Sequence, residues 1–349
     1  MTATLTPTHR QSVPTRRRLV GLGVALAVLL LVVAASLALG ARDVPLGTVV
    51  DALTARVPGD NDHNVVLDQR LPRTAVGLLV GAALGLAGTL MQGVTRNPLA
   101  DPGLLGINAG ASLFVVLAIS VLGVTSPSSY VWFAFAGAAA ATLLVYGIGA
   151  AGRHGATPVK LALVGTALAA GITSVLTLLL LSSTTATNAY RFWSVGSLAG
   201  RGSGESGTVV LTLLPVLAVG ALLALLCGRA LNLLSMGDDL ARGLGLDVGR
   251  ARLVAFAAAV VLAGGATALA GPVVFVGLVV PHLVRPLTGP DYRWVLPFAV
   301  VVGPALLLTA DVVGRLVARP GELEVGLVVA FVGAPVLIAI VRRTRTAGL

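Results

Sequence analysis

Several polar side chains in this chain lie inside long apolar stretches, where they are candidates for a functional role. Thr166, Thr173 and Thr177 are spaced by seven and four residues, which places them within about 20° of one line on a helix of 3.6 residues per turn. Their hydroxyl groups could line a water-filled path, and Thr89 and Gln92 form a similar pair in an earlier apolar stretch. The alternative is that these side chains bond to a helix carbonyl or to a neighbouring helix, as is common in membrane spans.

The sequence lacks the residue sets that indicate covalent catalysis or a metal centre. Its four histidines are scattered and none has H-E-x-x-H spacing: His9, His63, His154 and His282. The only lysine, Lys160, is not part of a G-x-x-x-x-G-K-[ST] loop that would bind ATP. The single cysteine, Cys227, excludes an internal disulfide and a cysteine-based metal cluster. We therefore predict no catalytic residue, no metal site and no cofactor.

Composition assigns the chain to the polytopic helical membrane proteins. Of 349 residues, 56% are hydrophobic and only 11% are charged, whereas a water-soluble domain has about 25% charged residues. The formal net charge of +10 could suggest a nucleic-acid partner, but only 4% of the residues are aromatic and the basic residues do not cluster with them. We interpret the positive charge as a mark of cytoplasmic loops. We therefore expect the protein to lie in a membrane and to have no nucleic-acid partner.

Ten apolar stretches indicate an all-α fold with ten transmembrane helices. The first, Leu19–Ala41, exceeds the roughly 7–15 residues of a signal-peptide core and is long enough to cross. The second follows Arg73, and the third and fourth lie on either side of the turn signal 125–129 within Pro102–Gly152. The region Leu253–Gly289 is divided at Gly271-Pro272 into two spans. The remaining four spans are Leu161–Leu181, Gly207–Cys227, Trp294–Ala310 and Val325–Val341. The predicted organisation is a cytoplasmic tail at 1–18, one membrane domain at 19–343 and a second cytoplasmic tail at 344–349.

The distribution of basic residues supports ten crossings. With both termini inside, cytoplasmic segments hold sixteen Lys and Arg and outer segments hold eight. If Leu253–Gly289 crossed only once, the tally would be thirteen against eleven. Because cytoplasmic loops carry an excess of Lys and Arg, the count favours ten helices in the cytoplasmic membrane, with both termini cytoplasmic.

The stretch 70–110 combines an arginine pair, a small-residue face and a turn. After the arginines, Gly77, Gly81 and Gly85 recur at four-residue spacing, which would bring one helix face close to a neighbouring backbone. A polar break at 96–102 then predicts a tight turn on the cytoplasmic side before the chain returns.

The cytoplasmic segment 228–252 contains a predicted short helix with exposed leucines. Ser235 followed by Asp238 is a helix-start signal, and Leu240 and Leu244 share one face of the helix. Closely following glycines end it after about two turns, and so short a helix is marginal alone. We therefore expect a partner to cover its leucines.

The chain resembles the permeases of the FecCD family, which are membrane subunits of ABC importers for iron-siderophore complexes, haem and cobalamin. The shared signatures occur in the expected order over almost the whole chain: RLPR at 70–73, MQ…NPLADPGLLGINAGA at 91–111, W-x-x-G-S at 193–197, the G-x-D-x-A-x-x-L-G-like run at 237–245, GPVVFVGLVVPHLVR at 271–285, D-x-x-x-R at 311–315 and EL-x-VG…GAPV at 322–336.

The resemblance implies the fold of a type II ABC importer permease and a set of partners. These are a second permease subunit, identical or related, two cytoplasmic ATPase subunits and an extracytoplasmic binding protein. Substrate would pass along the interface between the two permeases, beside the fifth span. Among the family's substrates we favour a ferric siderophore, with haem or cobalamin as the alternative.

The resemblance also implies roles for individual residues. By similarity, Arg70, Arg73 and Arg315 would meet acidic residues of the binding protein at the outer surface. The alternatives are interfacial anchoring for the first two and, for Arg315, pairing with Asp311 one helical turn earlier. The residues implied in coupling to the ATPase are Gly237, Asp238, Leu240, Ala241, Leu244 and Gly245.

One position departs from the family pattern. Glu324 replaces the proline of the usual ELPVG sequence, and we expect it to pair with Arg319 or Arg315. Two other classes of function are weaker matches. An ATPase-independent secondary transporter would need acidic residues in mid-span, and an intramembrane enzyme would need converging histidines or carboxylates, and the sequence predicts neither.

Overall fold

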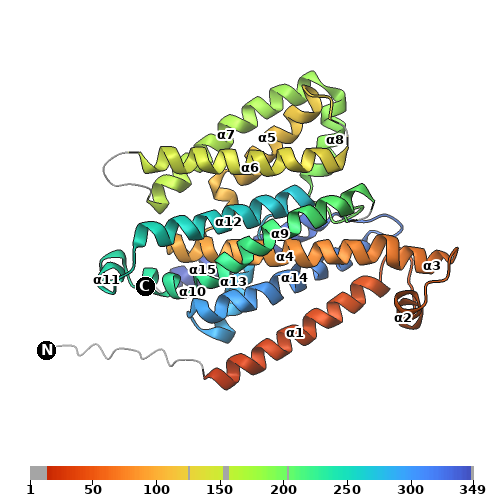
Figure 1. Cartoon of the computed structure of the whole chain (residues 1–349), viewed down its shortest axis with the longest axis horizontal. Helices are drawn as coiled ribbons and strands as arrows, with labels where there is room; N and C mark the ends of the chain where they lie inside the picture. Colours follow the sequence, from red (N-terminus) through yellow and green to blue (C-terminus); the bar gives the residue numbers. More distant parts are fainter. Residues whose placement is uncertain (1–13, 125, 152–156, 203, 347–349) are drawn as a thin grey trace.

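The computed structural model describes residues 14–124, 126–151, 157–202 and 204–346, and over these residues it is helical with no strand (Figure 1). The first half contains α1 Thr15–Ala38, α2 Leu46–Thr54, α3 Asn61–Asn64, the π-helix η1 Val65–Arg70, α4 Leu71–Thr95, the 3-10 helix η2 Pro102–Leu105, α5 Ile107–Ser120, α6 Pro127–Ala150 and α7 Pro158–Ser182. The second half contains α8 Thr184–Ser194, α9 Glu205–Leu226, α10 Gly228–Ser235, α11 Asp238–Gly243, α12 Val248–Ala270, α13 Val276–Thr288, α14 Tyr292–Val317 and α15 Val325–Thr346.

Seven of these helices are long and apolar enough to cross a membrane. They are α1, the continuous run Asn61–Thr95, α6, α7, α9, α12 and α14. Two further apolar helices, α5 and α13, are shorter, and α15 has a shorter apolar part, Val325–Ala339. All three lie where the sequence predicts the remaining crossings. All ten predicted stretches are thus helical.

The long helices lie side by side with α4 at their centre (Figure 1). Helix α4 packs against α12, α13 and α14, and α1 packs on the far side of α14. Helices α5, α6 and α7 form a separate layer at the top of the view. The short helices α2 and α3 lie at one end of the bundle and α11 lies at the other, so α4 connects two ends with different structures.

The glycine face of α4 allows the close packing that its spacing predicts. A Cβ atom at Gly81 would lie 2.5 Å from the Cα of Pro304 in α14, and one at Gly88 would lie 1.9 Å from the carbonyl oxygen of Gly277 in α13. Neither distance leaves room for a side chain. Backbone contact of this kind is a main source of helix association in lipid, where burying apolar surface gives little.

Several helix boundaries differ from the sequence prediction. Helix α1 begins at Thr15, so the end of the expected tail is helical, while residues 1–13 and 347–349 lie outside the described part. Residues 184–194 form the helix α8, which lies between the predicted spans 161–181 and 207–227. Helix α14 continues to Val317, seven residues beyond the expected end, and therefore includes Asp311 and Arg315.

The break between α12 and α13 lies close to the turn that follows α8, and this turn also bonds to the start of α15. Phe275 has a left-handed conformation with φ of 69°, and the chain is not helical from Gly271 to this residue. The amide of Ser197 donates to the Ala270 carbonyl at 2.7 Å, and that of Gly326 donates to the Gly196 carbonyl at 3.0 Å. These bonds satisfy backbone groups that lipid could not, which is a requirement for irregular backbone at membrane depth.

Candidate functional site

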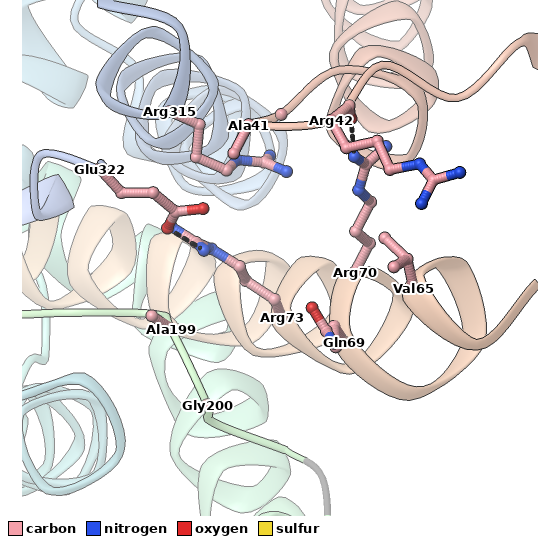
Figure 2. Close-up of a pocket in the computed structure, with 11 residues that line it drawn as sticks. Ala41, Arg42, Val65, Gln69, Arg70, Arg73, Ala199, Gly200, Arg315 and Glu322 are labelled. Atoms are coloured by element: carbon pink, nitrogen blue, oxygen red, sulfur yellow. Dashed lines mark hydrogen bonds and ion pairs between the residues drawn. The ribbon is translucent and has the colours of Figure 1, made fainter. Parts of the chain in front are cut away.

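Three arginines that the sequence assigns to one role come together at the end of the bundle where α2 and α3 lie, which we call the outer end after its predicted orientation. Arg70, Arg73 and Arg315 line a pocket of about 400 Å³ together with Arg42 and Glu322 (Figure 2). The pocket is bounded by the α1–α2 connection, the start of α4, the turn at Ala199-Gly200 and the end of α14. Residues from four distant parts of the chain therefore build one basic pocket.

Arg73 is neutralised by two carboxylates inside this cluster. Its Nε lies 3.1 Å from both oxygens of Asp311, and its Nη2 donates to Asp311 Oδ1 at 2.8 Å. Its Nη1 donates to Glu322 Oε2 at 2.6 Å. Asp311 is fully buried and also pairs with Arg315 through Oδ2 at 3.1 Å, which confirms the alternative of a pair within α14.

The other two arginines bind the carboxyl end of α1. Arg70 Nη1 donates to the Leu37 and Ala38 carbonyls at 2.7 Å each, and its Nη2 donates to the Arg42 carbonyl. Arg315 Nη1 donates to the Ser36 and Leu39 carbonyls at 3.0 Å each. The last carbonyl groups of a helix lack partners within it and carry partial negative charge, so two guanidinium groups satisfy them directly.

The three arginines are buried in this chain because of these bonds. The exposed fractions of Arg70, Arg73 and Arg315 are 6%, 8% and 2%. Paired charges are tolerated at this depth because each guanidinium has a carboxylate or several carbonyl groups to bind. Whether a binding protein contacts this region stays a prediction, but direct contact with exposed guanidinium groups at all three positions does not fit the structure.

The predicted partners of Glu324 are also wrong. Arg319 pairs with Asp43, with Nη2 2.5 Å from Oδ1, and this hydrogen bond holds the pKa of Asp43 below its ordinary value of 3.8. Arg315 pairs with Asp311 as described above. Glu324 directly precedes α15, and its carbonyl accepts from the Leu327 amide at 3.0 Å. It is Glu322, two residues earlier, that pairs with an arginine of the cluster.

The two polar groups of α4 do not line an open path in this structure. Thr89 and Gln92 are fully buried, with Thr89 Oγ1 donating to the Gly85 carbonyl at 2.8 Å and Gln92 Nε2 donating to the Leu278 carbonyl at 3.2 Å. Their role is internal: the first bonds within its helix, as the alternative states, and the second joins α4 to α13. Their part in a translocation path stays a prediction.

The threonines of α7 are arranged differently. Thr166, Thr173 and Thr177 are all exposed on α7, and each hydroxyl donates to a carbonyl of its own helix at 2.7–3.0 Å. These bonds leave the oxygen lone pairs free to accept from water or a solute. The three residues thus form a weakly polar stripe on an open helix face, and their role in a path stays a prediction.

The short helix predicted in the segment 228–252 forms as α11, with an exposed leucine in it and another directly after it. Leu240 and Leu244 are 48% and 56% exposed, whereas Ala241 is buried against the bundle. Gly237 precedes the helix with φ of 107° and Gly245 follows it with φ of 83°, conformations that suit glycine. The predicted start signal is wrong in one respect, because Ser235 belongs to the end of α10 and donates to the Asn232 carbonyl.

Two arginines that the sequence analysis did not single out hold α11 to the bundle. Asp238 Oδ1 accepts from Arg96 Nη2 at 2.8 Å and from Arg252 Nη2 at 3.0 Å. Arg96 ends α4 in a left-handed conformation with φ of 53°, and Arg252 lies in the first turns of α12. Basic residues at helix ends are common, so the sequence alone does not indicate that Arg96 and Arg252 have a special role. Their binding to one carboxylate becomes visible only in the folded structure.

The family model described as the FecCD transport family matches residues 28–343. The chain belongs to the FecCD transport family. It is accordingly a membrane transport component of an ABC importer family and not a catalytic subunit, and its apolar helices make it an integral membrane protein.

Individual FecCD relatives match over nearly their whole length. The chain is 48% identical to the ferric enterobactin transport system permease protein FepD of Escherichia coli K12, covering 93% of this chain and 95% of the relative. It is 42% identical to the siderophore transport system permease protein YfiZ of Bacillus subtilis, covering 90% and 93%. It is 36% identical to the hemin transport system permease protein HmuU of Yersinia pestis, covering 93% and 96%.

A solved structure shares the arrangement of helices with this FecCD chain. It is reported as an ABC transporter of the metal-chelate type in an inward-facing conformation. The two superpose with a TM-score of 0.78 at 26% identity, covering 92% of this chain and 98% of the other. The sequence resemblance and the three-dimensional fold therefore lead to the same family.

Proposed function

We propose that this chain is the permease subunit of a binding-protein-dependent ABC importer that carries a ferric siderophore across the cytoplasmic membrane. The observation that carries the proposal is the 48% identity to a ferric enterobactin permease over 93% of the chain. Identity to a hemin permease is 36%, which makes haem the second candidate substrate class. Cobalamin remains a third class known for the family.

The proposed topology has ten crossings with both termini in the cytoplasm. It combines the seven long apolar helices with α5, α13 and α15, and it treats 19–343 as one permease domain between the tails 1–18 and 344–349. The start of α1 lies at the same end of the bundle as α10, because Arg18 is 3.6 Å from Asp291 and Asn232 Nδ2 donates to Asp291 at 2.6 Å. The basic residues near these helices favour this end as the cytoplasmic one.

The proposed assembly contains a second permease, two ATPase subunits and a binding protein. Helix α11 would lie in a cleft of the ATPase with Leu240 and Leu244 as its apolar contacts, since exposed leucines on a two-turn helix gain stability when a partner covers them. The exposed threonine stripe of α7 would face the path between the two permeases, beside the passing chelate.

We infer that Asp238 transmits motion of the ATPase to the membrane helices. The carboxylate joins α11 to the end of α4 and the beginning of α12 through its two arginine bonds. Helix α4 continues from this point to the outer pocket, where Arg73 is bound by Asp311 and Glu322. A displacement of α11 would therefore act on the helix that reaches the opposite end of the protein.

Uptake in a deletion strain tests the substrate class. We expect loss of labelled ferric-siderophore uptake that a plasmid copy of the chain restores, with haem and cobalamin uptake unchanged. Loss confined to haem or to cobalamin would select one of the alternatives. Changing the Walker lysine of the ATPase should abolish uptake, and continued uptake would favour an ATPase-independent secondary transporter.

Co-purification with the ATPase tests the contact through α11. Leu240→Asp should prevent recovery of the ATPase with the permease, because a carboxylate would be buried in an apolar contact without a partner. Leu240→Met retains an apolar side chain and is the matched control. Unchanged recovery and uptake in the aspartate variant would show that α11 does not bind the ATPase.

A further inference from the structure

The short helix α2 carries an apolar stripe that no other element in the described part of the chain covers. Leu46, Val50 and Leu53 are 59%, 57% and 47% exposed. Their spacing of four and three residues places them within about 35° of one line along the helix. Single exposed apolar residues are ordinary on a protein surface, whereas a row of them on one helix face marks a contact with an apolar partner or with a membrane.

Helix α2 has three sides of different character. Val49 and Ala52 are buried against the end of α1 and against η1, about 100° from the stripe in one direction around the helix. Asp51 and Thr54 are exposed, about 100° from the stripe in the other direction. The stripe therefore lies between a side that packs on the protein and a side that suits water. A helix that lies at the boundary between lipid and water needs this order of faces.

Both ends of the segment that contains α2 are tied to the bundle by ion pairs. Arg42, which precedes α2, has its Nε 2.9 Å from Oδ1 of Asp62 in α3. Arg56, which follows α2, has its Nη2 3.0 Å from Oδ2 of Asp68 in η1. Turning α2 to bury the stripe would expose its packed side and pull on both pairs, so the stripe remains on the surface.

The position of α2 relates the stripe to the membrane. In Figure 1, α2 is seen nearly end-on at the outer end of α1, while the long helices lie across the view, so α2 runs across the bundle axis. Beside it, α1 is apolar enough to cross a membrane and leaves Val24, Leu30 and Leu31 exposed. That side of α1 faces lipid. Because α2 packs on the last residues of α1, its stripe lies where the lipid-facing surface of α1 ends.

A second copy of the permease does not fit this place. The contact between permeases that we propose is along α7, and the layer of α5, α6 and α7 lies on the opposite side of the bundle from α1 (Figure 1). A partner seated on that layer does not reach α2. Lipid is therefore the apolar phase next to the stripe.

We propose that α2 is an interfacial helix, with Leu46, Val50 and Leu53 inserted into the lipid leaflet at the outer end of the bundle. Apolar faces of such helices lie roughly 5–10 Å deep, at the boundary between headgroups and acyl chains. The insertion fixes the depth of the α1–α2 connection and, through the two ion pairs, that of α3 and η1, from which α4 continues. This contact with lipid goes beyond the proposed function and holds for any substrate of the importer.

Collisions of nitroxide spin labels with oxygen and with a nickel chelate test the contact. The full chain, purified with the subunits that accompany it and placed in nanodiscs of phosphatidylethanolamine and phosphatidylglycerol, carries one label at a time in a Cys227→Ala background. Labels at Val50→Cys and Leu53→Cys should show an oxygen-to-nickel collision ratio roughly fivefold or more above that at Thr54→Cys, because oxygen concentrates in hydrocarbon and a polar chelate stays in water. Leu26→Cys on α1 is the lipid reference, since its side chain is exposed near the middle of that helix.

The other possible surroundings of the stripe give different results. Frequent collisions with the nickel chelate at Val50→Cys and Leu53→Cys would show that water covers the stripe. Rare collisions with both reagents would show that protein covers it. A fall in oxygen collisions only after the importer's binding protein is added would assign the stripe to that partner. Each of these three results would overturn the proposal.

Quenching by nitroxide lipids tests the depth of α2. A fluorophore attached at Val50→Cys should be quenched more strongly by a phospholipid with its nitroxide near the headgroup than by one with its nitroxide near the end of the acyl chain. The same fluorophore at Leu26→Cys should show the reverse order. Equal or stronger quenching of the Val50→Cys label by the deep nitroxide would refute an interfacial position.

A charge placed in the stripe tests whether insertion depends on its apolar character. Val50→Asp should withdraw α2 from the lipid, because a carboxylate is costly to bury without a partner, and the collision ratio of the Leu53→Cys label should fall roughly fivefold or more. Thr54→Asp is the matched control, since it places the same charge on the exposed polar side. The gel-filtration profile establishes that each variant is folded. An unchanged ratio in the Val50→Asp variant would overturn the proposal.

Discussion

The two ends of α4 are both held by arginine–carboxylate pairs, but the pairs differ in burial. At the outer end, Arg73 is bound by the fully buried Asp311, which Arg315 shares. At the inner end, Arg96 and Asp238 have side chains that are 39% and 24% exposed. Water screens the inner pair but not the outer pair. Breaking the outer pair therefore leaves an unpaired charge in the interior, whereas breaking the inner pair leaves a charge that water can solvate. The outer end is therefore built for fixed geometry and the inner end for movement.

Removal of the outer carboxylate should have the largest effect on the folded protein. Asp311→Asn keeps the size of the side chain but leaves Arg73 and Arg315 without their shared counter-charge. We expect a loss of about 3–5 kcal/mol, as found when one partner of a buried pair is removed. The measurement is the thermal midpoint of the detergent-purified protein. A midpoint equal to that of the wild type would refute the contrast between the two ends.

The middle of α4 should show the second-largest effect. Gly88→Val places a branched side chain where even a Cβ would lie 1.9 Å from the Gly277 carbonyl oxygen, so α13 must move away. Overpacking of this kind costs about 1–3 kcal/mol or more. Gly171→Val on α7 is the control, because no atom lies within 4 Å of a Cβ there. The thermal midpoint should fall for the first variant only, and equal midpoints would contradict the packing.

Removal of the inner carboxylate should affect transport more than stability. Asp238→Asn weakens the bonds to Arg96 and Arg252 in a partly exposed site, so we expect a thermal midpoint close to that of the wild type and siderophore uptake reduced roughly tenfold. The control is Asp239→Asn, since Asp239 pairs only with Arg242 of the same short helix among the described residues. Equal uptake by the two variants would show that Asp238 does not couple α11 to α4.

Features that depend on local periodicity could be predicted from the sequence. The apolar stretches, the glycine face of α4 and the exposed leucines of α11 all follow from spacing along one helix, and the structure contains them. The end of α14 could not be placed in this way, because charged residues such as Asp311 and Arg315 are rare within membrane spans. Their mutual pairing and their bonds to Arg73 and α1 make burial possible, and these partners come from distant parts of the chain.

The direction of the outer arginines depends on the same long-range contacts. Arg70 and Arg315 bind carbonyl groups of α1 that are 32 and 276 or more residues away in the sequence. No local pattern reports which helix end will lie beside a guanidinium. A sequence signature could therefore predict that these arginines lie at the outer end of the protein. It could not show that Arg70 and Arg315 donate to the carbonyl groups at the end of α1.

The exposed pair at the outer surface should show the smallest effect and a defined pH dependence. Asp43 binds Arg319, which lowers the pKa of the carboxyl group below 3.8 in the folded protein. A lowered folded-state pKa contributes stability above the unfolded value, and that contribution is lost as the pH falls through the folded value. Asp43→Asn should therefore lower the thermal midpoint by about 1 °C or less at pH 7, since exposed pairs are weak. The difference should shrink as the pH falls below 3.8 and vanish once the pH is below the folded-state pKa. Asp51→Asn in α2 is the control, since no ion pair of Asp51 occurs among the described residues. An equal response of both variants would show that the Asp43–Arg319 pair does not join the α1–α2 connection to the end of α14.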